Sequence, residues 1–175
     1  RCDLTDPASY ADAVAVIIGA PYDAGTSYRS GARMGPMALR SCDYSEHTGS
    51  RPHLALRVDP LAGVVDAGDV EMAPTETQRS LANLQAAVLT ILRAGKVPVV
   101  LGGDHTVAQP DITALAEHFG YGRISVIHFD AHADTGDIQF GSLYGHGQPM
   151  RRVIESGAVR GDRFLQIGLR GYWPE

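Results

Sequence analysis

The chain is poor in the residues that build several common kinds of functional site. Its 175 residues include only two cysteines, Cys2 and Cys42, which form no Cys-x-x-Cys pair of the kind that binds structural zinc. A formal net charge of −5 leaves no basic excess for a nucleic acid backbone and better suits a small cationic substrate. No apolar run approaches the roughly 18 residues of a membrane span, and no secretory signal pattern opens the chain. We therefore expect a cytoplasmic protein with free thiols and neither a nucleic acid nor a membrane partner.

The order of apolar segments predicts an α/β fold. With 44% hydrophobic and 20% charged residues, the chain is long enough to bury the core of one domain, residues 1–175. Strands are predicted at 13–20, 63–69, 96–101, 123–129 and 163–169, and helices at 37–40, 75–95, 109–119 and 149–157. Residues 1–12 and 43–60 are predicted to be irregular. Strands that alternate with helices favour a three-layer αβα arrangement with a mostly parallel sheet.

A polar motif follows the strand predicted at 123–129. Asp130, His132 and Asp134 alternate with two alanines, and residues i, i+2 and i+4 of an extended segment project to one side. A carboxylate can bridge two cations, so this motif suits a pair of metal ions. Oxygen and nitrogen ligands favour Mn²⁺, with Co²⁺, Ni²⁺, Fe²⁺ or Zn²⁺ as alternatives. Taken alone, the motif is also compatible with a strand that ends in a polar turn.

A second polar motif, Gly102-Gly-Asp-His-Thr106, follows the strand predicted at 96–101. The carboxyl ends of neighbouring parallel strands lie side by side, so Asp104 and His105 can approach Asp130. No Gly-Lys-Ser/Thr follows the two glycines, which excludes a phosphate-binding loop and favours a tight exit that directs His105 to the site. Asp104 is either an acceptor that orients a metal ligand or a helix cap.

Together the two motifs resemble the arginase/agmatinase/formimidoylglutamase family, the ureohydrolases. The resemblance rests on residues 102–106, on Phe-Asp-Ala-His-Ala-Asp-Thr at 129–135, and on the spacing between them. Gly145-His-Gly-Gln-Pro149, Gly19-Ala-Pro-Tyr-Asp23 and Gly31-Ala-Arg-Met-Gly-Pro36 resemble further family elements. The resemblance spans nearly the whole chain and implies an arginase-like fold.

The resemblance also implies a site with two Mn²⁺ ions. His105 would bind one ion, His132 the other, Asp130 would bridge both, and Asp134 would bind beside His105. In this family a hydroxide held between the ions attacks the guanidinium carbon of the substrate, which releases urea and an amine. His146 matches the family's flexible-loop histidine, which carries a proton to the leaving amine. Asp130 and His146 are thus the expected catalytic residues.

Other polar residues are weaker candidates. Arg151 and Arg152 could bind a substrate carboxylate, although arginines on a short surface helix are commoner. The loop after the first strand offers candidate site-lining residues because ligands of α/β sheets bind at that edge, but a loop held together by its own hydrogen bonds is the alternative. These loop residues are Asp23, Tyr28, Arg29 and Arg33. His128, inside an apolar strand, is predicted to be a core histidine, and three histidines carry no signal: His47, His53 and His118.

Within the family, the chain resembles the agmatinase branch, which makes putrescine and urea from agmatine in polyamine metabolism. The segment Gly136–Tyr144 does not look like the asparagine- and serine-rich loop of arginases. Guanidinobutyrase and proclavaminate amidinohydrolase activities are close alternatives, and a non-catalytic paralogue of the same fold is a different class of alternative. The family also implies a homo-oligomer, a trimer or a hexamer.

One family element is absent from the sequence. The family's later Asp-x-Asp segment, which supplies further metal ligands, has no counterpart before Glu175. The strand predicted at 163–169 would also form a sheet edge with an exposed apolar face. We therefore expect residues 1–175 to be the N-terminal portion of a longer domain, truncated at the C-terminus, and to need further aspartates for activity.

Overall fold

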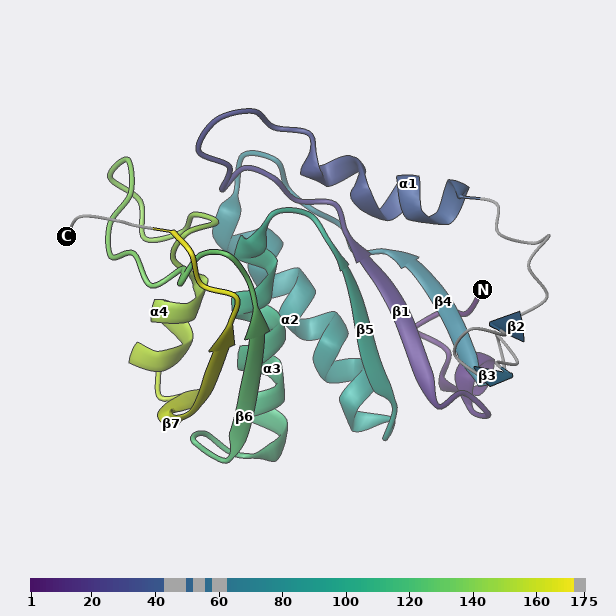
Figure 1. The fold of residues 1–175 in the computed structure, drawn as a ribbon. Coiled ribbons are helices and arrows are strands. Elements are labelled where there is room, and N and C mark those ends of the chain that lie inside the picture. The colour runs from purple at the N-terminus through teal and green to yellow at the C-terminus, as the bar shows by residue number, and fades with distance from the viewer. Residues whose placement is uncertain (43–49, 52–55, 58–62, 172–175) are drawn as a thin grey trace.

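The computed structural model describes residues 1–42, 50–51, 56–57 and 63–171 (Figure 1). The strands are β1 (Ala15–Ala20), β2 (Ser50–Arg51), β3 (Leu56–Arg57), β4 (Val64–Asp69), β5 (Val97–Gly102), β6 (Ile124–Phe129) and β7 (Val159–Ile167). The α-helices are α1 (Gly35–Ser41), α2 (Thr77–Arg93), α3 (Ala108–Phe119) and α4 (Pro149–Glu155), and the short 3-10 helices are η1 (Pro7–Tyr10), η2 (Ala32–Met34) and η4 (His105–Val107). Of the helices in these ranges, none is both long and apolar enough to cross a membrane.

The five strands predicted from the sequence all pair in parallel. β1 lies between β4 and β5 and pairs with both in parallel, in the order β4-β1-β5. β6 and β7 pair in parallel in a separate two-stranded sheet. The prediction of an α/β fold with parallel strands is therefore confirmed, while the hydrogen bonds of the described residues divide these strands between two sheets.

Two segments predicted to be irregular contain regular structure. Within 43–60 the structure describes the short antiparallel strands β2 and β3, and His47 and His53 lie outside the described residues. Within 1–12 the chain forms η1, which Asp6 caps by accepting a hydrogen bond from the amide of Ala8. Tyr10 of η1 is buried in the core, so residues 1–12, predicted to be an irregular arm or loop, include a short helix that packs against the fold. An aromatic ring of this size stabilises a fold mainly through the apolar area that it buries.

The larger core lies between β1 and helix α2. Val16 and Ile18 of β1 are fully buried, as the β-branched composition of this central strand predicts. Leu84, Val88 and Ile91 are buried at helical spacing along one face of α2. A second core cluster lies between α3, α4 and the sheet of β6 and β7. Figure 1 shows α2 and α3 behind the strands in this view.

Side chains of β6 and β7 alternate between a covered and an open face. Val126 and Phe164 pack into the second core, whereas Ile127, Phe129 and Leu165 are 61%, 75% and 55% exposed. This alternation follows from the period of two along a strand. The exposed Leu165 of β7 agrees with the exposed apolar face that the sequence predicts for the strand at 163–169.

Candidate metal centre

The chain turns sharply after β6 instead of remaining extended. The strand ends at Phe129, residues 131 and 132 form a bend, and Asp134 has a φ of 51°, which few residues other than glycine adopt. The prediction that Asp130, His132 and Asp134 share one side of an extended segment is therefore wrong. The side chains that do converge are brought together by a turn, and unusual backbone conformations of this kind concentrate at functional sites.

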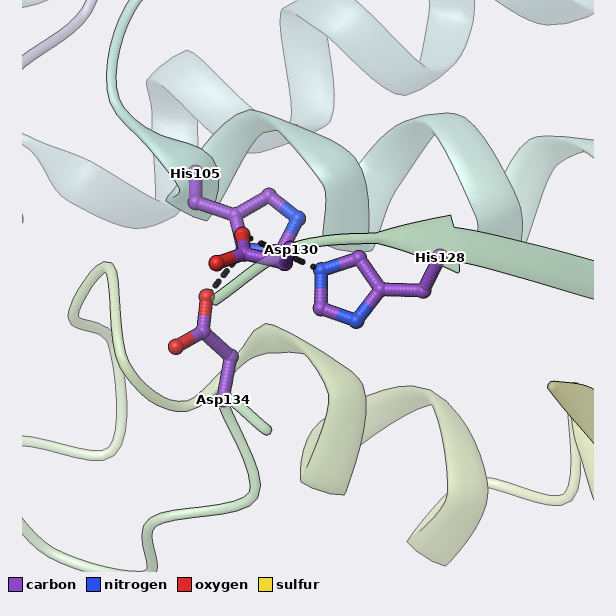
Figure 2. Close-up of side chains that lie close together, drawn as sticks. All are labelled: His105, His128, Asp130 and Asp134. Carbon is purple, nitrogen blue, oxygen red and sulfur yellow. Dashed lines mark hydrogen bonds and ion pairs between the residues drawn. The ribbon is translucent and has the colours of Figure 1, made fainter. Parts of the chain in front are cut away.

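Four side chains gather at this turn: His105, His128, Asp130 and Asp134. One nitrogen or oxygen atom from each lies within 4.8 Å of those from the others. Figure 2 shows His105 reaching the cluster from the exit of β5, His128 from the end of β6, and the two aspartates from the segment that follows. His105 Nδ1 contacts Asp134 Oδ2. Carboxylate and imidazole atoms at this spacing fit a divalent transition metal, and three of the four residues, His105, Asp130 and Asp134, are predicted ligands.

A close approach of two chain segments places His105. Gly103 has a φ of 23°, and a side chain there would collide with the backbone of Ala20 and Tyr22, so glycine is required. The Asp104 amide donates to the Tyr22 carbonyl at 2.7 Å. The buried Asp104 carboxylate accepts from the amide of Thr106 at 2.8 Å and thereby caps η4. The helix-cap interpretation of Asp104 is confirmed, and its side chain contacts none of the predicted ligands among the described residues.

His128 is buried, as predicted, but it also faces the cluster. Its side chain is 7% exposed, and Nδ1 lies 3.0 Å from Nε2 of Gln166. The same amide nitrogen donates to the Ala133 carbonyl at 2.7 Å, which assigns the Gln166 amide orientation. An amide nitrogen only donates, so His128 Nδ1 accepts and the ring proton is on Nε2. Nε2 has no hydrogen bond of good geometry and lies 3.3 Å from Asp130 Oδ2.

This tautomer gives His128 a role that the sequence did not reveal. A protonated Nε2 offers a proton to Asp130 and has no lone pair for an ion, so His128 supports the carboxylate instead of acting as a ligand. In the sequence, an inward-facing position two residues before Asp130 looks the same as any core position. The one available signal was a polar residue inside an otherwise apolar strand.

The surroundings of Asp130 favour its ionised form. Burial alone raises the pKa of this carboxyl, but the hydrogen bond from the His132 amide and the neighbouring histidines outweigh it, so the pKa lies below its ordinary value. The amide of His132 donates to Asp130 Oδ1 at 2.8 Å. An ionised carboxylate with hydrogen bonds already in place is the form that binds a cation.

His132 lies at the rim of the cluster. Its side chain is 54% exposed, and Nδ1 is 3.5 Å from Asp130 Oδ1. It is not among the four residues whose ligand atoms converge. The structure thus brings together three of the four predicted ligands, His105, Asp130 and Asp134, and leaves His132 beside Asp130.

His146 lies on the loop that joins the cluster to α4. The base of this loop is closed by a hydrogen bond of 3.0 Å from the Gly136 amide to the Gly147 carbonyl. The Asp134 carbonyl accepts from the amide of Met150 at 3.1 Å, which ties α4 to the cluster. The buried Gln148 donates from Nε2 to two carbonyls of the loop, those of residues 137 and 142. His146 is therefore held close to the site without belonging to the convergent group.

The weaker candidates have partners of their own. Arg152 Nη2 lies 3.0 Å from Asp137 Oδ1 and 3.2 Å from Glu155 Oε2. Arg151 Nε lies 2.7 Å from Glu155 Oε1, and its Nη2 is 3.4 Å from Asp137 Oδ2. Both arginines therefore have acidic partners, Asp137 and Glu155, near them in the structure.

The loop after β1 is held together largely by its own hydrogen bonds. The buried Asp23 accepts from the amide of Gly31 at 2.7 Å and from Arg33 Nε at 2.5 Å. The bond from Arg33 holds the pKa of Asp23 below its ordinary value. Tyr28 is exposed, and the guanidinium of Arg29 lies 5.1 Å from its ring centroid. None of these four residues belongs to the convergent group.

Comparisons with known proteins agree with these observations. Residues 13–175 match the sequence profile described as "Arginase family". The chain is 37% identical over 164 residues to proclavaminate amidinohydrolase of Streptomyces clavuligerus, covering 91% of this chain and 50% of that protein. It is 36% identical over 162 residues to the mitochondrial agmatinase of Gallus gallus, covering 90% and 45%. The chain spans about half the length of the curated relatives that it matches.

Comparison with solved structures agrees with the comparison of sequences. The structure superposes on the Mn²⁺-containing crystal structure of Trypanosoma cruzi formiminoglutamase with a TM-score of 0.80 at 32% sequence identity. The match covers 93% of this chain and 54% of that one.

Proposed function

The chain belongs to the arginase family, and from this premise we propose that it is a binuclear manganese amidinohydrolase, which cleaves a guanidino compound to urea and an amine. The observation that carries the proposal is the convergence of His105, Asp130 and Asp134 at the carboxyl ends of β5 and β6. In open α/β sheets this edge is the usual place for an active site.

The proposed metal ligands are His105, Asp130, His132 and Asp134. Asp130 is the proposed shared ligand because it belongs to the convergent group with His105, one of its oxygens lies 3.5 Å from Nδ1 of His132, and its ionised form is favoured. Two divalent cations, when bound, supply Lewis-acid activation of a water molecule at neutral pH, which attack on a resonance-stabilised guanidinium requires. A relative of similar fold was solved with Mn²⁺, which supports manganese as the metal.

His146 is the proposed proton carrier. The amine of the product is a poor leaving group unless its nitrogen is protonated. An imidazole can deliver that proton near neutral pH. His146 is held beside the site by the loop that begins at Asp134, without occupying a position in the ligand group. This separation suits a residue that acts on the leaving group and does not bind the ions.

Agmatine is the proposed substrate, with putrescine as the amine product. Arg151 and Arg152 have acidic partners in Asp137 and Glu155, which favours a substrate without a carboxylate. The net charge of −5 also suits a cationic substrate. A guanidino acid is the second candidate, because relatives named guanidino acid hydrolase and guanidinobutyrase are matched at 38% and 36% identity, as well as agmatinase at 36%.

Urea release tests the proposal. The full-length protein, loaded with Mn²⁺, is incubated with agmatine, 4-guanidinobutyrate and arginine, beside a His105→Gln variant and a His118→Gln control whose histidine lies on α3 outside the cluster. We expect agmatine to be cleaved fastest, the first variant to be inactive, and the control to match the parent. Preference for 4-guanidinobutyrate would contradict agmatine as the proposed substrate. Lack of urea from a protein with two bound ions would contradict the proposed amidinohydrolase activity. We also propose that the protein is cytoplasmic and forms a homo-oligomer, a trimer or hexamer. Analytical ultracentrifugation tests the oligomeric state.

A further inference from the structure

Residues 21–31, the loop that follows β1, connect the exit of β5 to the loop that carries His146. On one side, the carbonyl of Tyr22 accepts from the amide of Asp104 at 2.7 Å, and Asp104 Oδ2 accepts from the amide of Gly25 at 2.8 Å. On the other side, the carbonyl of Gly25 accepts from the amide of His146 at 3.0 Å. Gly25 therefore hydrogen-bonds both to the residue before His105 and to His146 itself.

The packing at Gly25 leaves no room for a side chain. A Cβ there would collide with Thr106 Oγ1 and would lie 3.0 Å from Asp104 Oδ2 and 3.2 Å from the amide nitrogen of His146. The backbone of this loop is thus in direct contact with both segments. Since Asp23 and Arg33 also tie the loop to itself, its position is determined at several points.

The imidazole of His146 makes a second contact with the same loop. Its Nε2 lies 2.9 Å from the hydroxyl of Ser27. A hydroxyl both donates and accepts, so this bond forms with either tautomer of the ring. Nδ1 of His146 has no hydrogen-bond partner among the residues that the structure describes, and is the nitrogen left for another group.

From this arrangement we propose that Ser27 is a positioning residue, whose hydroxyl orients the imidazole of His146. Ser27 lies on the loop 21–31, which the hydrogen bond between Gly25 and Asp104 holds to the exit of β5. The backbone bond at Gly25 sets where His146 lies, and the bond to Ser27 sets how its ring is rotated. A histidine that moves a proton must present one nitrogen in a defined direction, and a second hydrogen bond on the other nitrogen is the usual way to achieve this. The catalytic consequence rests on the proposed function, whereas the orientation of the ring does not.

Three variants test the proposal on the full-length protein. Ser27→Ala removes the hydroxyl, Ser27→Thr retains it, and Ser30→Ala is the matched control. Ser30 is an exposed serine of the same loop whose side chain has no hydrogen bond within the described part of the chain. The orientation is read from the rate at which diethyl pyrocarbonate modifies His146, followed by peptide mass spectrometry, and from the ¹⁵N chemical shifts of its ring, assigned with His146→Gln.

The expected result is selective for the hydroxyl. Ser27→Ala frees Nε2, so modification of His146 becomes about fivefold faster, as expected for loss of one ordinary hydrogen bond, and the ring shifts change. Ser27→Thr and Ser30→Ala keep the parent's rate and shifts. Equal modification rates in Ser27→Ala, Ser30→Ala and the parent would overturn the proposal.

A second measurement separates this inference from the proposed function. In the Mn²⁺-loaded enzyme we expect Ser27→Ala to lower kcat for urea release about tenfold with KM unchanged, because ring orientation acts on proton transfer and not on substrate binding. Thr at position 27 restores kcat. If no variant releases urea but Ser27→Ala alone alters the reactivity of His146, the positioning stands and the proposed function fails. If urea is released at the same kcat by all variants, Ser27 has no role in the reaction.

Discussion

The ring nitrogen Nε2 of His128 lies 3.3 Å from Oδ2 of Asp130, while Nδ1 of the same ring is held by Gln166 on the neighbouring strand. The parallel register of β6 and β7 places His128 directly beside Gln166. A residue on one strand therefore determines which nitrogen of His128 carries the proton, and through it how Asp130 is supported. Residues that support metal ligands in this way often matter nearly as much as the ligands themselves.

Replacement of Gln166 is expected to weaken metal binding without removing a ligand. In Gln166→Leu, His128 loses the bond that selects its tautomer, and Mn²⁺ affinity falls about 10–100-fold. In Gln166→Glu, a carboxylate opposite Nδ1 draws the proton to that nitrogen, which leaves a lone pair facing Asp130 and has a similar effect. Isothermal titration with Mn²⁺ measures the change. Gln85→Leu, on the surface of α2, is the control, and equal affinity in all three variants would contradict the role of Gln166.

Asp130→Asn is expected to lose at least one metal ion per chain. The substitution removes the negative charge of the proposed shared ligand and sets an amide group against the protonated Nε2 of His128. Elemental analysis of the folded variant, loaded with Mn²⁺ and desalted, measures the occupancy. Asp162→Asn is the control because that carboxylate pairs with Arg160 on the surface. Two ions per chain in Asp130→Asn would show that this residue is not shared.

Gly25→Ala is expected to destabilise the protein by about 1–3 kcal/mol because its methyl group overlaps Thr106 Oγ1. Urea unfolding followed by circular dichroism measures the loss. Gly161→Ala is the matched control, since a Cβ there meets no heavy atom within 4 Å, and it leaves stability unchanged or slightly raised. Adding Thr106→Ala to Gly25→Ala restores part of the loss because Thr106 Oγ1 has no hydrogen-bond partner to forfeit. Equal stabilities of the two glycine variants would refute the close-packing argument.

Asp111→Asn is expected to stabilise the protein above pH 6. Burial raises the pKa of Asp111 to about 6 in the folded state, from an ordinary value of 3.8. The folded state therefore binds this proton more tightly than the unfolded state, and stability falls as the pH rises from about 4 through 6. Removing the charge recovers about 1–3 kcal/mol at pH 8 and nothing below about pH 4. The gain is measured by urea unfolding across this pH range.

The control for Asp111→Asn is Asp12→Asn, since Asp12 is exposed and its side chain has no hydrogen bond within the described ranges. This variant should track the parent at every pH. A gain in Asp111→Asn that is the same at pH 4 and pH 8 would mean that ionisation of Asp111 is not its cause.

His146→Ala is expected to slow urea release about 10²–10⁴-fold while the protein retains its metal ions. The reason is that His146 contacts Gly25 and Ser27 and is absent from the group of convergent ligand atoms. Steady-state kinetics and elemental analysis of the same preparation measure both quantities. Stoichiometric loss of Mn²⁺ in the variant would place His146 among the ligands and would contradict its assignment as a proton carrier.

Local patterns in the sequence were enough to predict the strands that carry the site. The apolar runs at 96–101 and 123–129 form β5 and β6, and the motifs that follow them deliver His105, Asp130 and Asp134 to one place. Such features depend on the period of side chains along a strand and on the turn residues that end it, so they can be seen in a short window of sequence. The cap role of Asp104 was one of two interpretations offered by the same local pattern, and the structure selected it.

The remaining features of the site depend on contacts between residues far apart in the chain. The pairing of His128 with Gln166 needs the register of β6 with β7, and the meeting of Ser27 with His146 joins residues 119 positions apart. The left-handed backbone of Asp134, which replaced the predicted extended segment, allows its side chain to reach His105. A residue's own sequence neighbours carry no information about these partners, because the packing of the whole fold decides which distant side chains come within hydrogen-bond distance. The sequence by itself therefore determined three of the groups that converge, His105, Asp130 and Asp134, and the tertiary structure decided that His128 joins them, that His132 stays outside, and how the groups are oriented.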